Sequence, residues 1–246
     1  MKTTFKALVA FSLILLVVGF SSCLNSDDTP MRLGSFVTLN SLYPEDRILI
    51  TDEGYKLSPT NPNALMRRTE GGEASYPTRA SIVFELADGA EHFDPETVNS
   101  VTIVQALEIP TKTMSPKHDV DEKFYISKLG NISAGNGYVT LLDFVFNTTE
   151  KELSENGVLK MFNMYIDRVD KDTLFINFVR EVQEEEGFAM ERAGFMSVQL
   201  PHRIELQSNY PDIELSGDSV NVKIVSKGRL DEWLKTNPAV IRAKIN

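Results

Sequence analysis

The residue with the most definite chemistry is Cys23, the only cysteine in the chain. An uncharged, mostly apolar stretch runs from Ala7 to Phe20 behind two lysines, and Ser21 and Ser22 follow it. Small residues before a cut let a peptidase hold the backbone extended, and a thiol can carry diacylglycerol. The pattern is typical of a bacterial lipoprotein signal. It predicts removal of residues 1–22 and a lipidated Cys23 as the mature N-terminus.

Two other interpretations of this segment stay open. The first is an uncleaved signal anchor, but the apolar stretch is shorter than the about 20 residues that a helix needs to cross a bilayer. The second is an ordinary secretory signal with an incidental cysteine. Because the single cysteine stands where the apolar stretch ends, lipidation is favoured over coincidence.

The chain is acidic, with a formal net charge of −10. Removing the signal takes away two lysines, so the mature charge is −10 − 2 = −12. Nucleic-acid binders need clustered Lys and Arg to displace phosphate counterions, so we expect no nucleic-acid partner. Since Cys23 has no second cysteine to pair with, we also expect no disulfide and a fold that depends on packing.

The residues after the lipidation site are polar and rich in turn formers, which predicts a lipidated flexible tether over 23–33. Within it, Ser26, Asp27 and Asp28 resemble the serine and acidic run that directs some lipoproteins of Gram-negative gut anaerobes to the cell surface. We therefore expect an outer-membrane protein held by its N-terminal lipid and displayed on the surface. Periplasmic retention, with the two carboxylates in an ordinary solvated tether, is the alternative.

The region 34–113 contains short β-branched and apolar runs separated by turns, which indicates a small β-barrel. Prolines and glycines interrupt the pattern over 58–78 and predict a loop there. The expected strands are Ser35–Leu42, Arg47–Thr51, Tyr55–Leu57, Arg79–Leu86 and Val98–Ile109.

A charged stretch with proline over 114–122 predicts a linker, and the region 123–246 then has strands at the spacing of a β-sandwich. One helix is expected, over Arg229–Lys235. The chain is therefore predicted to be all-β, with two domains that fold separately. The strands expected in the second region are Phe124–Leu129, Tyr138–Phe146, Met161–Val169, Thr173–Val182, Gly194–Leu200, Arg203–Leu206 and Val220–Val225.

The order of these parts resembles the NigD-like lipoproteins. The matching features are the Cys23 signal and three barrel segments, Gly34–Leu39, Ile48–Leu57 and Val101–Ile109. The resemblance implies an OB-like barrel followed by a C-terminal β-sandwich. It implies no established chemistry, and it makes a bacteriocin-associated accessory or immunity role the alternative function. The tail from Ser226 onward has no counterpart in this pattern.

A search for catalytic and metal-binding residues identifies little. The three histidines lie far apart, and no H-E-x-x-H, G-x-S-x-G or Walker pattern occurs. His118, Asp119, Asp121 and Glu122 could hold a divalent cation, but a solvated linker is the favoured interpretation. Glu184–Glu186 similarly predicts an exposed loop. We expect no enzyme activity, no catalytic or metal site and no cofactor.

Aromatic residues offer a further test, because OB barrels can bind sugars or nucleotides by stacking. Alternation along the strands places most of the barrel aromatics in the core, which disfavours a stacking face. The barrel candidates are Phe36, Tyr43, Tyr55, Tyr76 and Phe84, and the aromatics expected in the sandwich core are Phe144, Phe146, Phe162, Tyr165, Phe175 and Phe178. We expect a binding or assembly module whose partner is an unknown protein or glycan.

Two tripeptides resemble the Asp-Ser/Thr-apolar acceptor for O-glycosylation in the envelope of the same bacterial group. They are Asp172-Thr173-Leu174 and Asp218-Ser219-Val220. Both are expected where a turn leads into a strand, with an exposed hydroxyl that could carry a glycan. The alternative is that Thr173 and Ser219 are plain turn residues.

Overall fold

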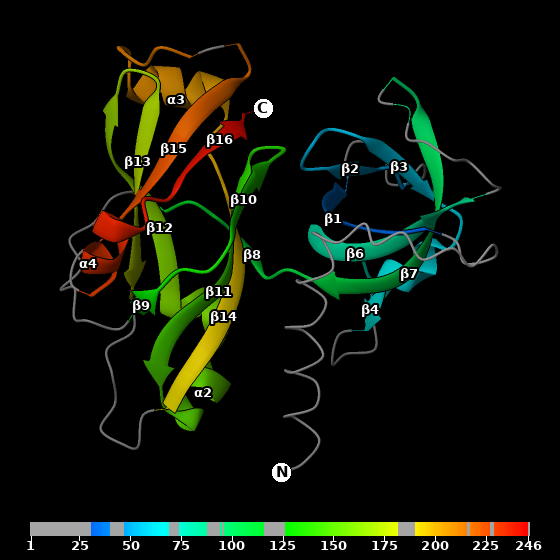
Figure 1. Cartoon of the computed structure of the whole chain (residues 1–246), viewed down its shortest axis with the longest axis horizontal. Helices are drawn as coiled ribbons and strands as arrows, with labels where there is room; N and C mark the ends of the chain where they lie inside the picture. Colours follow the sequence, from blue (N-terminus) through cyan, green and yellow to red (C-terminus); the bar gives the residue numbers. More distant parts are fainter. Residues whose placement is uncertain are drawn as a thin grey trace.

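The structure is a computed structural model of the whole chain, and it describes residues 31–39, 47–68, 74–87, 94, 96–115, 126–181, 190–215, 217–226 and 229–245. Figure 1 shows two β units, with the first in blue to cyan and the second in green to red. The prediction of an all-β fold is confirmed. Within the described residues, every helix is too short or too polar to span a bilayer.

The first unit is a closed barrel of five strands in the order β1-β2-β3-β7-β6. All neighbours pair antiparallel except β3 and β7, which are parallel, so the barrel closes through one parallel pair. This confirms the small barrel that the sequence predicts. The strands are β1 (Arg32–Leu39), β2 (Leu49–Thr51), β3 (Lys56–Pro59), β6 (Arg79–Leu86) and β7 (Val98–Glu108).

The barrel core follows from alternation along these strands. Ala80, Ile82 and Phe84 are buried on β6, and Val101 and Ile103 are buried on β7. The loop between β3 and β6 contributes a short 3-10 helix, η2 (Pro62–Leu65), and a two-stranded ribbon formed by β4 (Arg67–Arg68) and β5 (Ala74–Ser75).

The second unit consists of two sheets packed face to face. One has the order β10-β11-β14-β8, with β9 also paired to β11, and the other has the order β12-β13-β15-β16. The first sheet comprises β8 (Thr111–Thr113), β9 (Ile126–Lys128), β10 (Ile132–Gly135), β11 (Tyr138–Thr148) and β14 (Met190–Gln199); the second comprises β12 (Phe162–Asp170), β13 (Thr173–Arg180), β15 (Ser219–Val225) and β16 (Val240–Lys244).

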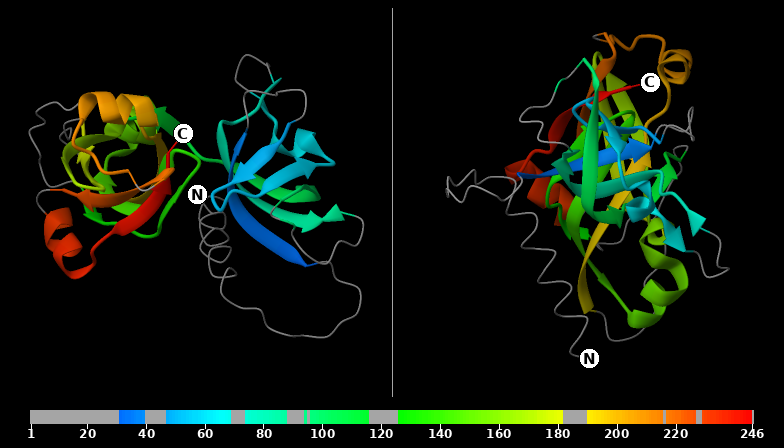
Figure 2. Two further views of the ribbon diagram at one scale, coloured as in Figure 1. Left: turned by 90° about the horizontal axis from the view of Figure 1, so that it is seen from above. Right: turned by 90° about the vertical axis from the view of Figure 1, so that its right-hand side faces the viewer.

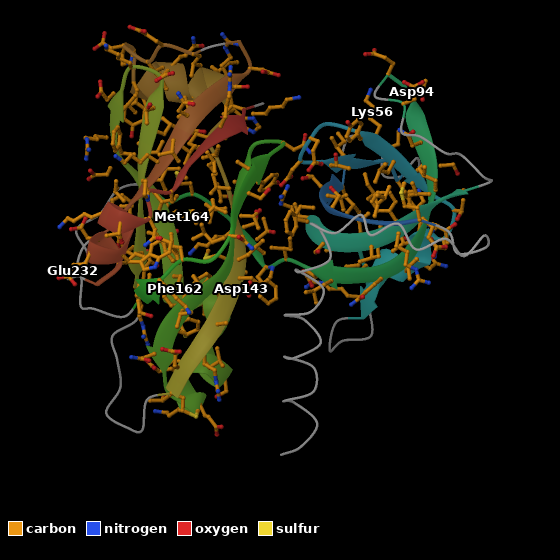
Figure 3. The ribbon with its side chains drawn as sticks, viewed as in Figure 1. Lys56, Asp94, Asp143, Phe162, Met164 and Glu232 are labelled. Atoms are coloured by element: carbon orange, nitrogen blue, oxygen red, sulfur yellow. The ribbon has the colours of Figure 1, made fainter. Side chains whose placement is uncertain are left out.

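Four phenylalanines fill the space between these sheets. Phe144 meets Phe162 and Phe178 edge to face, with ring centroids 5.0 and 5.1 Å apart. Such aromatic pairs contribute about 0.5–1.5 kcal/mol each beyond the area that they bury. Gly194 on β14 makes room for them, because a Cβ there would lie 2.6 Å from the Phe144 ring. Figure 3 shows Phe162 inside the sandwich on the same strand as Met164.

Among its described residues, the sandwich also carries three α-helices: α2 (Glu150–Met161), α3 (Arg203–Asn209) and α4 (Arg229–Thr236). The helix α4 confirms the predicted helix. The prediction of a strand over Arg203–Leu206 is wrong, because this segment forms α3. Leu206 and Tyr210 both pack on the core and lie four residues apart, whereas Ile204 is 82% exposed, so the segment follows the helical period.

The expected boundary after residue 113 also needs correction. Residues 111–113 form β8, which pairs in parallel with β14 of the sandwich instead of joining the barrel. The crossing point is Pro110, whose carbonyl already accepts the backbone N–H of Ser197. In the expected linker 114–122, the backbone N–H groups of Met114 and Ser115 bond to Gln199 and Met164. Residues 109–110 therefore separate the units.

Polar groups hold the two units against each other, side by side in Figure 2. The β10–β11 turn reaches the barrel, where the Asn136 amide donates to the carbonyls of Ile50 and Thr51 at 3.0 and 2.7 Å. Gly135 comes so close that a Cβ there would lie 2.4 Å from the Cα of Asp52. Only glycine fits at this position without moving the barrel.

Candidate binding site

Most of the site residues predicted from sequence lie outside the described residues. These are the lipidation residue Cys23, the export run Ser26, Asp27 and Asp28, the cluster that begins at His118, and Glu184–Glu186. Their proposed roles remain predictions. Within the described part of the chain, no three His, Cys, Asp or Glu side chains gather closely enough to hold a metal ion.

The two glycosylation-like tripeptides are described. Thr173 begins β13 and Ser219 begins β15, so both follow a turn as predicted. Each hydroxyl donates to the preceding aspartate at 3.0 Å. Thr173 is half-buried, but Ser219 is only 8% exposed because it lies within the sheet opposite Lys244. The expectation of an exposed hydroxyl is therefore wrong for Ser219, and modification of either residue stays a prediction.

The aromatic residues mostly lie in the cores. In the barrel, Phe84 is buried, and Tyr55 and Tyr76 pack against the same core. In the sandwich, the expectation is wrong for Phe175, which is half-buried on the outer face of its sheet. Its ring is covered by the Arg168 guanidinium, whose carbon lies 3.9 Å from the ring centroid. The other sandwich aromatics named above are buried.

Two ion pairs are buried within the part of the chain that the structure describes. The first joins Arg79 of β6 to Asp52, and Arg79 is 0% exposed. Its Nη2 lies 2.9 and 3.0 Å from the two carboxylate oxygens and 3.0 Å from the Thr140 hydroxyl of the sandwich. Ser133 of the sandwich donates to Asp52 at 2.8 Å. Burial raises the pKa of Asp52, although Arg79 and Ser133 act in the opposite direction.

The second pair joins Arg180 of β13 to Glu152 of α2 at 2.7 Å. Glu152 also accepts the Thr149 backbone N–H and the Thr148 hydroxyl, at 3.0 and 2.9 Å. Burial alone would raise the pKa of Glu152, but these donors and Arg180 outweigh it, so the pKa lies below its usual range. Both pairs are enclosed by packed protein, which indicates a structural role.

An open hollow lies at the end of the sandwich that carries α3, and we call it the α3 hollow. Its volume is about 510 Å³, within the range of small-molecule sites. One wall is the turn between β12 and β13, and the other is the segment between α3 and β15. It is lined by Val169, Asp170, Lys171, Asn209, Tyr210, Pro211, Asp212, Ile213 and Glu214.

Backbone bonds fix both walls of the α3 hollow. The N–H of Glu214 donates to the carbonyl of Lys171 at 3.0 Å and ties the walls together. The N–H of Ile213 donates to the carbonyl of Tyr210 at 3.1 Å, which closes the turn after α3. Ile213 is buried in the core, and Tyr210 packs against it. The walls are therefore anchored to the sandwich core.

The polar side chains around the α3 hollow have no internal partner. Within the described part of the chain, Asp170, Asn209, Asp212 and Glu214 make no side-chain hydrogen bond or ion pair, and they are exposed. The nearby Asp172 differs, because it accepts from Thr173 and Asn221. Hydrogen-bond acceptors and an amide group are therefore available around a preformed concave surface.

Sequence reasoning missed the α3 hollow because its walls are far apart in the chain. The available signal was Asn209-Tyr210-Pro211-Asp212, where an aromatic residue stands among turn formers and polar groups. The strand expected over Arg203–Leu206 hid the fact that this segment follows a helix. The contact with the β12–β13 turn is visible only in the structure.

The sequence matches no family model and no curated protein. Solved structures do resemble the fold. A "putative toxin related protein" from Parabacteroides distasonis has a TM-score of 0.50 at 16% identity, over 88% of this chain and 94% of its own. A "putative lipoprotein" from Bacteroides fragilis has a TM-score of 0.49 at 13% identity, over 88% and 99%. A NigD-like immunity protein from Bacteroides caccae has a TM-score of 0.42 at 17% identity, over 89% and 94%.

At these identities the likeness concerns the fold alone, and the Parabacteroides structure supports the arrangement of two β units. The solved structures that resemble this chain thus include a NigD-like immunity protein and a protein named as a lipoprotein.

Proposed function

We propose that the chain is a non-enzymatic lipoprotein of the bacterial envelope that acts as a binding module at the outer membrane, on the cell surface, and that the α3 hollow is its binding site. The observation that carries the proposal is the set of polar side chains that surround this hollow without partners among the described residues. A concave surface with a few convergent polar groups is the usual form of a ligand site.

The two-unit architecture supports a binding role. The barrel and the sandwich share a buried polar junction at Arg79, so the sandwich is held in a fixed orientation to the barrel that follows the tether. In Figure 1 α3 and α2 lie at opposite ends of the sandwich. A lipid at Cys23 would hold the protein at the membrane.

Site-specific photocrosslinking in living cells tests the binding site. A benzophenone amino acid in place of Lys171, an exposed residue that lines the α3 hollow, is the probe, and the same amino acid in place of Lys160, an exposed residue of α2, is the matched control. We expect an adduct that forms at position 171 and not at position 160. Equal yields at the two positions, or none at either, would contradict the proposed site.

The anchor is tested by labelling cells with a palmitate analogue. We expect label on the wild-type protein and none on Cys23→Ala, with an unchanged unfolding midpoint because no described residue needs the thiol. Protease added to intact cells then distinguishes the membrane faces: digestion of the labelled protein supports surface display, and protection supports the periplasmic face.

The alternative, a bacteriocin-associated accessory or immunity role, requires a protein partner. It predicts a polypeptide adduct at position 171 and protection of producing cells that is lost when the protein is removed. A ligand that is recovered chemically changed after incubation with the purified chain would instead contradict the non-enzymatic proposal.

A further inference from the structure

We propose that the α3 hollow binds a carbohydrate, through one or two sugar units, an inference that rests on the function proposed above. Sugar recognition needs hydrogen-bond acceptors and amides that can bond to adjacent hydroxyl groups of the sugar. It also needs an apolar surface against the C–H face of the ring. The hollow supplies Asp170, Asp212 and Asn209 as hydrogen-bonding groups, and Tyr210 and Pro211 as apolar surface.

The charges of the residues that line the α3 hollow disfavour some classes of ligand. Asp170, Asp212 and Glu214 are acidic, and Lys171 is the basic residue among the lining groups. A phosphate or an acidic sugar would meet like charges, which disfavours it. An apolar ligand would cover the carboxylates without satisfying them, which is costly. A neutral sugar or an amino sugar satisfies these groups and avoids both penalties.

The hollow is also preorganised for such a ligand. The bond from the Glu214 N–H to the Lys171 carbonyl fixes the distance between the walls, and the buried Ile213 and Leu206 hold the segment around Tyr210 on the core. A site that is ordered before binding loses less conformational entropy when the ligand enters. Weakly held sugars benefit most from this, because each hydroxyl contributes little free energy.

The test is saturation-transfer NMR and calorimetry on the full chain purified from cells. The probes are glucose, galactose, mannose, fucose, N-acetylglucosamine and glucosamine. Inorganic phosphate and an oligolysine peptide are the comparison ligands. We expect at least one sugar to bind in both measurements and phosphate to give no heat of binding in calorimetry. Because a hydrogen bond to a charged group is lost, Asp212→Asn should weaken sugar binding by about ten-fold.

Two further variants separate binding from folding. Tyr210→Leu keeps apolar volume against the core but removes the aromatic ring, and we expect it to weaken sugar binding with little change in the unfolding midpoint. Glu191→Gln removes a carboxylate from β14 opposite Asn147, away from the hollow, and should bind like the wild type.

The outcomes separate this inference from the proposed function. Sugar binding that Asp212→Asn and Tyr210→Leu weaken and Glu191→Gln leaves intact supports a carbohydrate site. If only oligolysine binds, or if no probe binds while position 171 still crosslinks to a protein in cells, the carbohydrate proposal is overturned and the binding module stands. Absence of both sugar binding and crosslinking overturns both proposals.

Discussion

Arg180 and Glu152 meet inside the sandwich, whereas Arg79 and Asp52 meet where the barrel contacts it. Both arginines are almost completely buried, but their carboxylate partners are satisfied to different extents. Glu152 accepts bonds at both oxygens. At the junction, Asp52 Oδ1 and Arg79 Nε are buried without a hydrogen bond among the described residues.

This difference explains why burial acts differently on the two acids. Removing a carboxylate from water penalises the charged form, and enough donors can overcome that penalty. At Glu152 the donors prevail and lower the pKa, but at Asp52 burial prevails and raises it. The balance between the depth of burial and the number of donors to a carboxylate, more than the presence of an arginine, decides whether its charge favours folding.

The largest expected effect is that of Glu152→Ala. It leaves Arg180 buried without its partner and removes the reciprocal cap of α2, in which Thr149 and Glu152 bond to each other. We expect a loss of about 3–5 kcal/mol of unfolding free energy, measured by urea denaturation. The control is Glu150→Ala, at an exposed position of the same helical turn, which should change stability by less than about 0.5 kcal/mol. Equal losses would contradict the comparison.

A smaller effect is expected for Asp52→Ala at the junction. A methyl group accepts no hydrogen bond, so Arg79 and Ser133 both lose their acceptor, and we expect a loss of about 1–3 kcal/mol of unfolding free energy. Hydrogen exchange should rise first at the β10–β11 turn, because Asn136 there bonds to the barrel. Glu53→Gln, at an exposed neighbour, is the control. Faster exchange throughout both units, with no preference for the turn, would contradict a role at the junction.

The pH dependence should have opposite signs at the two pairs. Glu152 has a folded pKa below 4.5, so its charge stabilises the fold above its unfolded pKa, and this is lost as pH falls through the folded pKa. Asp52 has a folded pKa above 3.8, so its charge opposes folding at neutral pH, and protonation relieves this as pH falls through the folded pKa.

Urea midpoints measured from neutral to acidic pH test these signs. Relative to Glu152→Gln, the wild type should lose stability as the pH is lowered below 4.5. Relative to Asp52→Asn, it should gain stability as the pH falls through the folded pKa of Asp52, which lies above 3.8. If the difference in urea midpoint between wild type and variant changed with pH in the same direction for both variants, burial would act equally on both acids.

Much of the fold was predictable because apolar and polar residues alternate along the strands. The five barrel strands and most sandwich strands were found, and their boundaries differ by a few residues. The helix α2 was missed even though Thr149 and Glu152 have the spacing of a capping box. Its apolar residues do not follow a helical face, and Gly157 breaks it with a φ of 60°, so periodicity gave no signal.

The junction between the two units and the candidate site could not be predicted from the sequence, for a different reason. Arg79 opened a predicted strand, where an arginine is normally exposed. Only the fold places it beside Asp52 and Thr140, which come from distant parts of the chain. The α3 hollow likewise joins Lys171 to Glu214 through a long-range contact. Side chains that depend on such contacts carry no local pattern.

The smallest expected effect concerns a third arginine, Arg168, which stacks on Phe175 but is 58% exposed. Water already solvates most of this guanidinium, so the ring replaces little hydration, and Arg168→Ala should cost about 0.5–1 kcal/mol. Lys223→Ala should cost less, because its ammonium lies 5.6 Å from the same ring instead of 3.9 Å. A double-mutant cycle with Phe175→Leu isolates the stacking from the charge. If Arg168→Ala cost as much stability as Asp52→Ala, burial would not be what distinguishes these arginines, and the contrast between the two buried pairs would need another cause.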